Sequence, residues 1–281
     1  MSEREPVLWG EGPSAWRRAL GLVGMSDDLM SVRILAAFGS AQDRSLLRQA
    51  AAMAPIPVDI IEADSVAAAR SRLLANAIDV AFLDVAAAPD ELTSFIAAAR
   101  STKPAPFVIL VAAAAWGKRE PKADGLAPDG IVAKPAMIEQ ATVLIDRCIK
   151  LRMPSRVLVV DDSATMRNIV RKLLTGIRFP LEIAEAEEGI AALKQIASGK
   201  FDFVFLDYSM PGLNGIETLA EIKRQYPKVQ VVIMTSVPDE AVAERARAAG
   251  AAAFLRKPFY PADIDAVLQG IYGLRASART W

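Results

Sequence analysis

The sequence predicts an α/β protein made of two doubly wound domains, each a five-stranded parallel sheet with helices on both faces. Two observations predict this architecture. Short apolar runs alternate with stretches of helical periodicity along most of the 281 residues, and the same order of runs occurs twice. A hydrophobic fraction of 53% supplies enough apolar material to fill a core in each domain.

A constant spacing relates the two halves of the chain. Asp84 ends the segment Val-Ala-Phe-Leu-Asp and Asp207 ends Phe-Val-Phe-Leu-Asp, so these aspartates are 207 − 84 = 123 residues apart. Lys134 and Lys257, each followed by proline, are also 257 − 134 = 123 residues apart. Two landmarks that share one offset indicate that a single supersecondary plan has been used twice.

The order of elements is clearest in the second half. Short apolar runs predict buried strands, and apolar residues at helical spacing, such as Met166, Ile169 and Val170, predict helices. The expected strands are 156–160, 181–186, 203–206, 229–234 and 253–255, and the expected helices are 166–174, 189–197, 216–224, 240–249 and 262–269. In the first half, strands are expected near 33–38, 58–61, 80–83, 107–111 and 131–133, with helices between them.

These elements divide the chain into parts. We expect an N-terminal extension at 1–30, a first domain at 31–150, a linker at 151–154, a second domain at 155–274 and a tail at 275–281. Within the extension, Ser14 could cap a short helix whose apolar face packs on the first domain, a partner-binding arm being the alternative. The proline- and glycine-rich segment 117–130 is not expected to hold a full fourth helix.

The composition excludes several classes of protein. Without a histidine, the chain cannot be a histidine kinase, a histidine phosphotransfer protein, a Ser-His-Asp hydrolase or a His-ligated zinc protein. Equal numbers of basic and acidic residues, 33 of each, give no reason to expect nucleic acid or a membrane surface as a partner. The longest apolar run, 107–116, is about half of a bilayer span, and the single Cys148 cannot form an internal disulfide, so cytoplasmic residence is expected.

Polar residues follow the strands of the second half. Asp161 and Asp162 follow the first strand, Asp207 the third, Thr235 the fourth and Lys257 the fifth. Because ligands of open α/β sheets bind at the carboxyl ends of the strands, these side chains are expected to converge there. Adjacent carboxylates repel one another, and hard oxygen ligands suit Mg²⁺, which would relieve that repulsion.

This set of side chains fits phosphoryl transfer to a carboxylate. A carboxylate such as Asp207 can act as a nucleophile and form an aspartyl phosphate. Lys257 would supply positive charge and Thr235 a hydrogen bond to the phosphoryl oxygens. The expected metal ligands are Asp161, Asp162, Asp207 and the main-chain carbonyl of Ser209.

Four motifs, in this order, resemble the receiver domains of bacterial response regulators, especially the chemotaxis type. They are Val-Leu-Val-Val-Asp-Asp-Ser-Ala-Thr-Met-Arg at 157–167, Leu-Asp-Tyr-Ser-Met-Pro-Gly-Leu-Asn-Gly at 206–215, Met-Thr-Ser at 234–236 and Lys-Pro-Phe at 257–259. The resemblance covers about 155–272 and implies a flavodoxin-like fold. It also implies roles for particular residues: phosphoacceptor Asp207, Mg²⁺ acids Asp161 and Asp162, switch pair Thr235 and Lys257, and switch aromatic Phe254.

The first half lacks most of this chemistry. At the 123-residue offset, Asp161 and Asp162 correspond to Phe38 and Gly39, and Thr235 corresponds to Ala112, whereas Asp84 and Lys134 are retained. We therefore expect 31–150 to be a degenerate receiver without a Mg²⁺ site. Asp84 and Lys134 are interpreted as an inert remnant, with a permanent mimic of the phosphorylated contact as the alternative.

The expected function is that of a two-component response regulator without an output domain. Phosphorylation of Asp207 is expected to switch protein–protein interaction or dimerisation, and the protein is not expected to be an enzyme beyond its own phosphorylation and dephosphorylation. One alternative is a phosphorelay intermediate or phosphate sink, and another is a structural dimer with an idle site. The resemblance implies a sensor histidine kinase or histidine phosphotransfer protein, a downstream protein target and a second copy of the chain as partners, the last through 240–249 and 261–269.

Overall fold

The computed structural model describes residues 31–113, 128–237 and 240–274. The helix expected near Ser14 and most of the segment 117–130 lie outside these residues. The described residues form two compact units, the first mainly from residues up to Cys148 and the second from Ile149 onward. Among them, no helix combines the length and the apolar character that crossing a bilayer requires.

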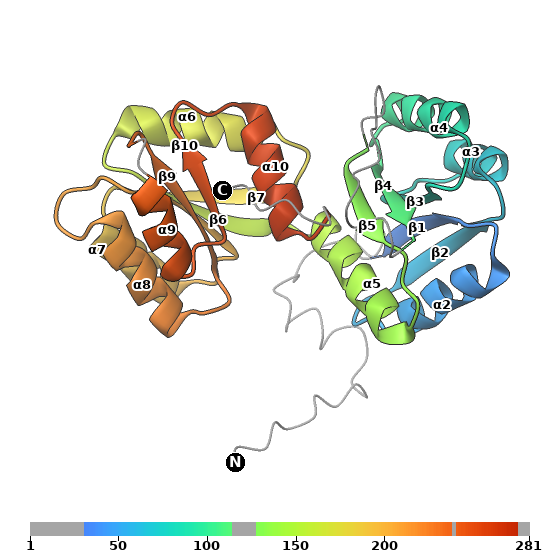
Figure 1. Ribbon diagram of the computed structural model, residues 1–281, viewed down its shortest axis with the longest axis horizontal. Helices are drawn as coiled ribbons and strands as arrows, with labels where there is room; N and C mark the ends of the chain where they lie inside the picture. The colour runs from blue at the N-terminus through green and yellow to red at the C-terminus, as the bar shows by residue number, and fades with distance from the viewer. Residues whose placement is uncertain (1–30, 114–127, 238–239, 275–281) are drawn as a thin grey trace, which may run out of the picture. The chain divides into compact units, whose positions relative to one another are not determined.

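The first unit contains one five-stranded parallel sheet in the order β2-β1-β3-β4-β5. Figure 1 shows α2 and α5 on one face of this sheet and α3 and α4 on the other. In chain order the elements are β1 (Val32–Ala37), α2 (Ala41–Ala52), β2 (Val58–Ala63), α3 (Val66–Ala75), β3 (Val80–Asp84), α4 (Pro89–Ser101), β4 (Phe107–Ala112), β5 (Gly130–Ala133) and α5 (Ile138–Arg152).

The second unit has the same sheet order, β7-β6-β8-β9-β10. Helices α6 and α10 cover one face, and α7, α8 and α9 cover the other (Figure 1). The elements are β6 (Ser155–Val160), α6 (Ala164–Thr175), β7 (Leu181–Ala186), α7 (Gly189–Ser198), β8 (Phe203–Asp207), α8 (Gly215–Gln225), β9 (Gln230–Thr235), α9 (Glu240–Ala248), β10 (Ala253–Arg256) and α10 (Pro261–Ile271). This order confirms the doubly wound, flavodoxin-like fold predicted for both halves.

The central strands lie in the core because both of their faces are covered by helices. Val157, Leu158, Val159 and Val160 of β6 are fully buried, and so are Val204, Phe205 and Leu206 of β8. Such continuous apolar runs are typical of the inner strands of parallel sheets. The polar residues that follow these runs are therefore held at the sheet edge by a rigid core.

The linker differs from the expectation. Helix α5 continues to Arg152, so two of the four residues expected as linker, Leu151 and Arg152, are helical and only Met153 and Pro154 separate α5 from β6. The apolar face of α5 extends to Leu151, whose side chain is 1% exposed, which favours continuing the helix. Pro154 then disfavours helical conformation at the residue before it.

Register confirms the repeat in three dimensions. Strand β1 pairs with β2 from Val32 with Val58, and β6 pairs with β7 from Ser155 with Leu181, at the same 123-residue offset. The Phe38 amide donates to the Ala63 carbonyl at 3.1 Å, and the Asp161 amide donates to the Ala186 carbonyl at 3.3 Å. Phe38 therefore occupies the structural position of Asp161.

Candidate functional site

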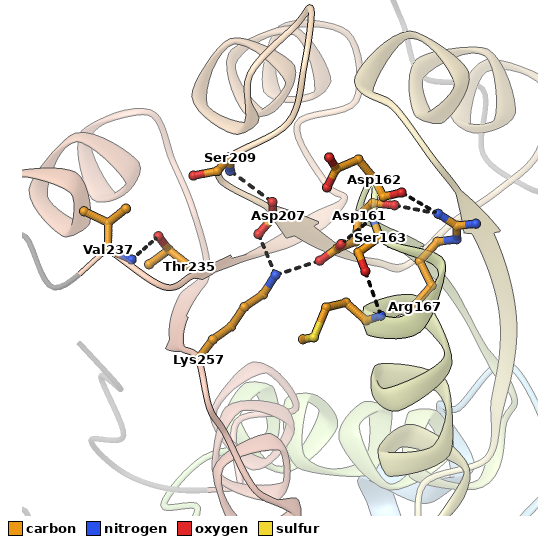
Figure 2. A network of polar contacts seen from close by, with 10 residues as sticks. Asp161, Asp162, Ser163, Arg167, Asp207, Ser209, Thr235, Val237 and Lys257 are labelled. Carbon is orange, nitrogen blue, oxygen red and sulfur yellow. Dashed lines mark hydrogen bonds and ion pairs between the residues drawn. The ribbon is translucent and has the colours of Figure 1, made fainter.

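Three carboxylates converge at the carboxyl edge of the second sheet. Asp161 and Asp162 follow β6, and Asp207 is the last residue of β8. One oxygen of each lies within 4.8 Å of the others. Figure 2 shows the three side chains facing the same space, with Asp207 between the acid pair and Thr235. The convergence follows from the topology, because β6 and β8 are neighbouring parallel strands.

Lys257 joins two of these carboxylates from the end of β10. Its Nζ donates to Asp161 Oδ2 at 2.7 Å and to Asp207 Oδ1 at 2.8 Å. The remaining oxygens accept from main-chain amides, Asp161 Oδ1 from Ser163 at 2.9 Å and Asp207 Oδ2 from Ser209 at 3.1 Å. Asp161 is 1% exposed and Asp207 is 5% exposed, whereas Asp162 is exposed to solvent.

Burial and charge act on this cluster in opposite directions. Burial raises the pKa of Asp207, the hydrogen bond and charge of Lys257 lower it, Asp161 raises it, and the net pKa is above the ordinary value. Burial alone would lower the pKa of Lys257, but its two carboxylate partners raise the net value. Two of the three carboxylates thus share one ammonium with Asp162 nearby, and the site carries uncompensated negative charge.

The donor set fits a divalent cation that prefers oxygen. Asp161, Asp162 and Asp207 offer hard oxygens within reach of one ion, and the excess negative charge is what a cation would neutralise. Asp162 is open to solvent, which suits an ion such as Mg²⁺ that keeps several waters. These three carboxylates therefore fit the role of Mg²⁺ ligands.

The other predicted residues lie around this cluster. Thr235 ends β9 and is 1% exposed, and its hydroxyl accepts from the Val237 amide at 3.0 Å (Figure 2). Ser209 is exposed and contributes its amide to Asp207, while nothing in its contacts tests the expected carbonyl ligand. Phe254, the expected switch aromatic, lies on β10, half-buried against the apolar core.

A tight turn after β8 sets the position of Asp207. The Tyr208 amide donates to the Met234 carbonyl of β9 at 2.8 Å, and the Gly215 amide returns to the Tyr208 carbonyl at 3.1 Å. Gly212 has φ of 75°, in the left-handed region that glycine tolerates. A Cβ on Gly215 would lie 2.4 Å from the Asp207 carbonyl oxygen, so only glycine fits where α8 begins.

Sequence reasoning missed an arginine that holds the main chain of the acid pair. We call this residue, Arg167, and its partner Glu185 the arginine brace. Arg167 of α6 donates through Nη1 to the carbonyl oxygen of Asp161 at 2.8 Å and to that of Asp162 at 3.4 Å. Its Nε donates to Glu185 Oε2 of β7 at 3.2 Å. Arg167 is thus bonded at once to the acid-bearing loop and to a neighbouring strand.

The first unit holds its retained pair differently. Lys134 Nζ donates to Asp84 Oδ2 at 2.5 Å and to Asp43 Oδ2, in the first turn of α2, at 3.1 Å. The Phe38 ring lies 5.6 Å from Lys134 Nζ, on the side where the second unit has Asp161. Burial would lower the pKa of Lys134, but the two carboxylates raise it above its ordinary value. Asp43 has therefore replaced the lost acid as the second partner of the lysine.

A sequence signal existed for the brace but not for Asp43. Arg44 and Glu62 of the first unit repeat the contacts of Arg167 and Glu185, with Arg44 Nε donating to Glu62 Oε2 at 3.2 Å. Both residues precede their counterparts by the same 123 positions that relate the aspartates and lysines. Asp43 corresponds to Met166 at that offset, so the repeat offers no counterpart that would have drawn attention to it.

The comparisons with known proteins agree with this geometry for the second unit. The sequence profile of the response regulator receiver domain matches residues 157–269. Chemotaxis protein CheY-3 of Vibrio cholerae is 34% identical over 119 residues, which cover 42% of this chain and 91% of that protein. The cyclic di-GMP phosphodiesterase response regulator RpfG of Xanthomonas campestris pv. campestris is 26% identical over 152 residues, 53% of this chain and 40% of that protein.

Two solved structures also align with this chain. Chemotaxis protein CheY4 of Vibrio cholerae is 29% identical, and the match covers 42% of this chain and 98% of that one at a TM-score of 0.39. A probable two-component response regulator with a GGDEF domain is 24% identical and matches 86% of this chain and 99% of that one at a TM-score of 0.47. Through residues 157–269, the chain belongs to the response regulator receiver domain family.

Proposed function

We propose that the chain is a two-component response regulator in which Asp207 accepts a phosphoryl group and thereby changes the binding of a protein partner. The observation that carries this proposal is the environment of the Asp207 carboxylate. It is buried, bonded to the Lys257 ammonium at 2.8 Å and flanked by two further carboxylates. A buried carboxylate beside a lysine and an acid pair is arranged for phosphoryl transfer.

In the proposed reaction, a carboxylate oxygen of Asp207 forms a bond to phosphorus. The bond between phosphorus and the donor's leaving group breaks, and the leaving group departs with the bonding electrons. Asp161, Asp162, Asp207 and the Ser209 carbonyl would hold Mg²⁺, which supplies positive charge to the phosphoryl oxygens. Lys257 is already within hydrogen-bond reach of Asp207 and adds a second positive charge there.

The switch would operate through Thr235 and Lys257. The Thr235 hydroxyl accepts from the Val237 amide, and rotation toward a phosphoryl oxygen would exchange this bond for a charge-assisted one. Lys257 would transfer one of its bonds from the Asp207 carboxylate to the phosphoryl group. Because Thr235 precedes α9 and Lys257 separates β10 from α10, both changes bias the α9–β10–α10 surface. A half-buried Phe254 on β10 would follow the movement of Thr235.

The first unit, proposed as a pseudo-receiver domain at 31–150, would not take up phosphate. Its lysine is bonded to two carboxylates, and an aromatic ring and a glycine occupy the places of the acid pair. Asp84 therefore lacks the acid pair that would hold a cation beside it, and the carboxylate that it does have nearby, Asp43, is bonded to the same lysine. The second unit, at 155–274, would be the phosphoacceptor domain.

The phosphoryl donor is proposed to be a phosphohistidine of another protein. This chain has no histidine, so a phosphohistidine cannot be supplied from within it. Receiver domains interact with histidine kinases and phosphotransfer proteins, and membership of that family supports the same source here. A sensor histidine kinase or a histidine phosphotransfer protein is thus the proposed upstream partner.

Intact-mass measurement after incubation with a small acyl phosphate and Mg²⁺ tests the proposal. We expect one phosphoryl group on the wild type, none on Asp207→Ala, none after chelation of the metal, and one on Asp84→Ala. Asp84→Ala is the matched control because Asp84 lies at the same strand position in the first unit. Incorporation that survives Asp207→Ala would place the phosphoacceptor elsewhere and contradict the proposal.

A further inference from the structure

Arg167 fixes the loop that carries the acid pair by its main chain. Figure 2 shows its guanidinium beside Asp161 and Asp162, on the side away from Asp207 and Lys257. One nitrogen, Nη1, donates to both carbonyl oxygens, at 2.8 Å and 3.4 Å. These two bonds hold the backbone of Asp161 and Asp162 and leave the carboxylate oxygens of both residues to other partners.

Arg167 is itself held from behind. Glu185 of β7 pairs with Arg167 Nε at 3.2 Å and with Arg171 Nε at 3.2 Å. The Arg167 side chain is 15% exposed, so this contact is shielded from water more than a surface ion pair is. A planar guanidinium with two partners in fixed directions leaves the loop little freedom to shift.

The first unit carries the same three charged residues without the acids. Arg44 Nη1 donates to the carbonyl oxygens of Phe38 and Gly39, the latter at 3.1 Å, and Arg44 and Arg48 both pair with Glu62. In that unit the brace holds a loop with no carboxylate to position. The chain thus contains a structural copy of the brace that is separated from any metal-binding role.

We propose that Arg167, oriented by Glu185, is a positioning residue that sets the affinity of the Asp161–Asp162–Asp207 site for Mg²⁺. The inference rests on the proposed Mg²⁺ site of the second unit. Residues that orient metal ligands without touching the metal typically change metal affinity by about 10- to 100-fold when they are removed. Arg167 acts here through main-chain carbonyls, so its effect is on where the carboxylates stand.

Charge and geometry predict opposite results, which makes the role testable. Removing a cation near a cation site strengthens Mg²⁺ binding if the arginine acts only through its charge. Releasing the loop weakens binding, because the carboxylates must then be ordered by the ion itself. Removing Arg167 and Glu185 together leaves the net charge unchanged and isolates the geometric effect.

Titration calorimetry of the full chain with MgCl₂ tests this role. The test variant is Arg167→Met/Glu185→Gln, and the control is Arg44→Met/Glu62→Gln, the same double substitution at the equivalent pair of the first unit. We expect the first double variant to bind Mg²⁺ at least about 10-fold more weakly than the wild type and the second to bind it as the wild type does. Thermal unfolding should show a similar loss of stability in both variants, each in its own unit. Arg167→Lys, which keeps the charge but not the fork, should weaken binding too.

The outcomes separate the inference from the function on which it rests. Wild-type affinity in Arg167→Met/Glu185→Gln, together with reduced stability, would overturn the positioning role and leave the Mg²⁺ site standing. Tighter binding in Arg167→Met alone and unchanged binding in Arg167→Lys would show that the arginine acts by charge, which also overturns it. Absence of Mg²⁺ binding by the wild type would remove the metal site and the inference together.

Discussion

The balance of charge around Asp207 determines how a substitution of this residue changes the stability of the second unit. Without a metal, Asp161 and Asp207 share Lys257, with Asp162 close by, and burial raises the pKa of Asp207 above its ordinary value of about 4. Between the ordinary pKa of the unfolded chain and the raised pKa of the folded chain, the folded chain therefore binds more protons than the unfolded chain. The stability contributed by Asp207 falls as pH rises through that window, and at neutral pH Asp207 destabilises the metal-free fold.

Asp207→Asn should accordingly raise the Tm of the second unit at pH 7 without Mg²⁺. The expected rise is a few degrees, which corresponds to about 1 kcal/mol in the free energy of unfolding. Lys257 keeps Asp161 as a partner in this variant. Saturating Mg²⁺ should stabilise the wild type by about 1.4 kcal/mol at ten times its dissociation constant and the variant by less. Scanning calorimetry with and without chelator measures both effects; a lower Tm for Asp207→Asn in the chelator would contradict this account of the charge balance.

Gly215 is a second residue whose role follows from its surroundings. A methyl group there would lie 2.4 Å from the Asp207 carbonyl oxygen and 2.8 Å from Tyr208 Cα, and both are backbone atoms that cannot move alone. Gly215→Ala should destabilise the second unit by about 1–3 kcal/mol and slow phosphorylation of Asp207 by displacing the turn. Gly199→Ala is the control, because the nearest atom to its Cβ would be the flexible end of Arg156 at 3.0 Å, and the nearest backbone atom, the Gln195 carbonyl oxygen, would lie at an ordinary contact distance of 3.5 Å. Urea unfolding that shows equal losses for the two variants would argue against a special role for Gly215.

At the scale of elements, helix α2 contributes a carboxylate to the lysine of the first unit, which its counterpart α6 does not do in the second. Its first turn places Asp43 against Lys134, and both side chains are about one quarter exposed, at 26% and 27%. Asp43→Asn should therefore destabilise the first unit by about 0.5–1 kcal/mol, because a partly exposed ion pair is worth little more.

A double-mutant cycle with Lys134→Met separates this pair from the favourable effect of any carboxylate at a helix N-terminus. We expect a coupling free energy of the same size, about 0.5–1 kcal/mol, in urea unfolding of the first unit. Additive effects of Asp43→Asn and Lys134→Met would show that Asp43 acts on the helix alone. The second unit should keep its Tm in all three variants, which serves as the internal control.

The elements themselves could be predicted because each is specified locally. The buried runs of β6 and β8 and the helical spacing in α6 gave bounds within two residues of those observed. The structure departs from the prediction where contacts between residues far apart in the sequence determine the local structure. Asp43 pairs with Lys134 across 91 positions, and its counterpart in the repeat, Met166, is not acidic. Helix α5 runs into the expected linker because Leu151 is buried, which depends on packing that a single helical segment does not reveal.

The arrangement of the candidate site was predictable for a topological reason. The neighbouring parallel strands β6 and β8 end at the same edge, so Asp161 and Asp207 had to meet there. Lys257 follows β10, which ends at the same edge with β9 between it and β8, and its long side chain spans that distance. The brace beneath them was not predicted, although Arg44 and Glu62 repeat Arg167 and Glu185 at the 123-residue offset. A repeated pair of charged residues does not say what they contact, and the bonds of Arg167 to two main-chain carbonyls are seen only in the fold.

At the scale of the whole molecule, one fold serves two different sites. Both units keep the sheet order, the brace and a lysine bonded to the aspartate at the end of the third strand. They differ in net charge around that lysine: three carboxylates in the second unit and two, with an aromatic ring, in the first. The second site therefore has the larger excess of negative charge, which a divalent cation would neutralise, and the first has a smaller excess.

Phosphorylation is expected to strengthen self-association through α9, β10 and α10. Helix α9 has an acidic residue in its first turn, Glu240, and basic residues in its last turn, Arg245 and Arg247. Two copies of such a helix related by a two-fold axis perpendicular to it run antiparallel, which places each acidic end beside a basic end. The helix lies directly after Thr235, so a change at the phosphorylated site reaches this surface through one short connection.

Sedimentation velocity with and without beryllofluoride and Mg²⁺, a stable mimic of the phosphoryl group, measures this effect. The wild type should shift toward a dimer when the mimic is present, and Asp207→Ala should not respond, because it cannot hold the mimic. Arg245→Glu should weaken the dimer by placing like charges opposite one another, while the same variant still takes up one phosphoryl group from an acyl phosphate. A sedimentation coefficient that is unchanged by the mimic in the wild type would mean that the α9–β10–α10 surface serves a different protein, and self-association would be abandoned as the output.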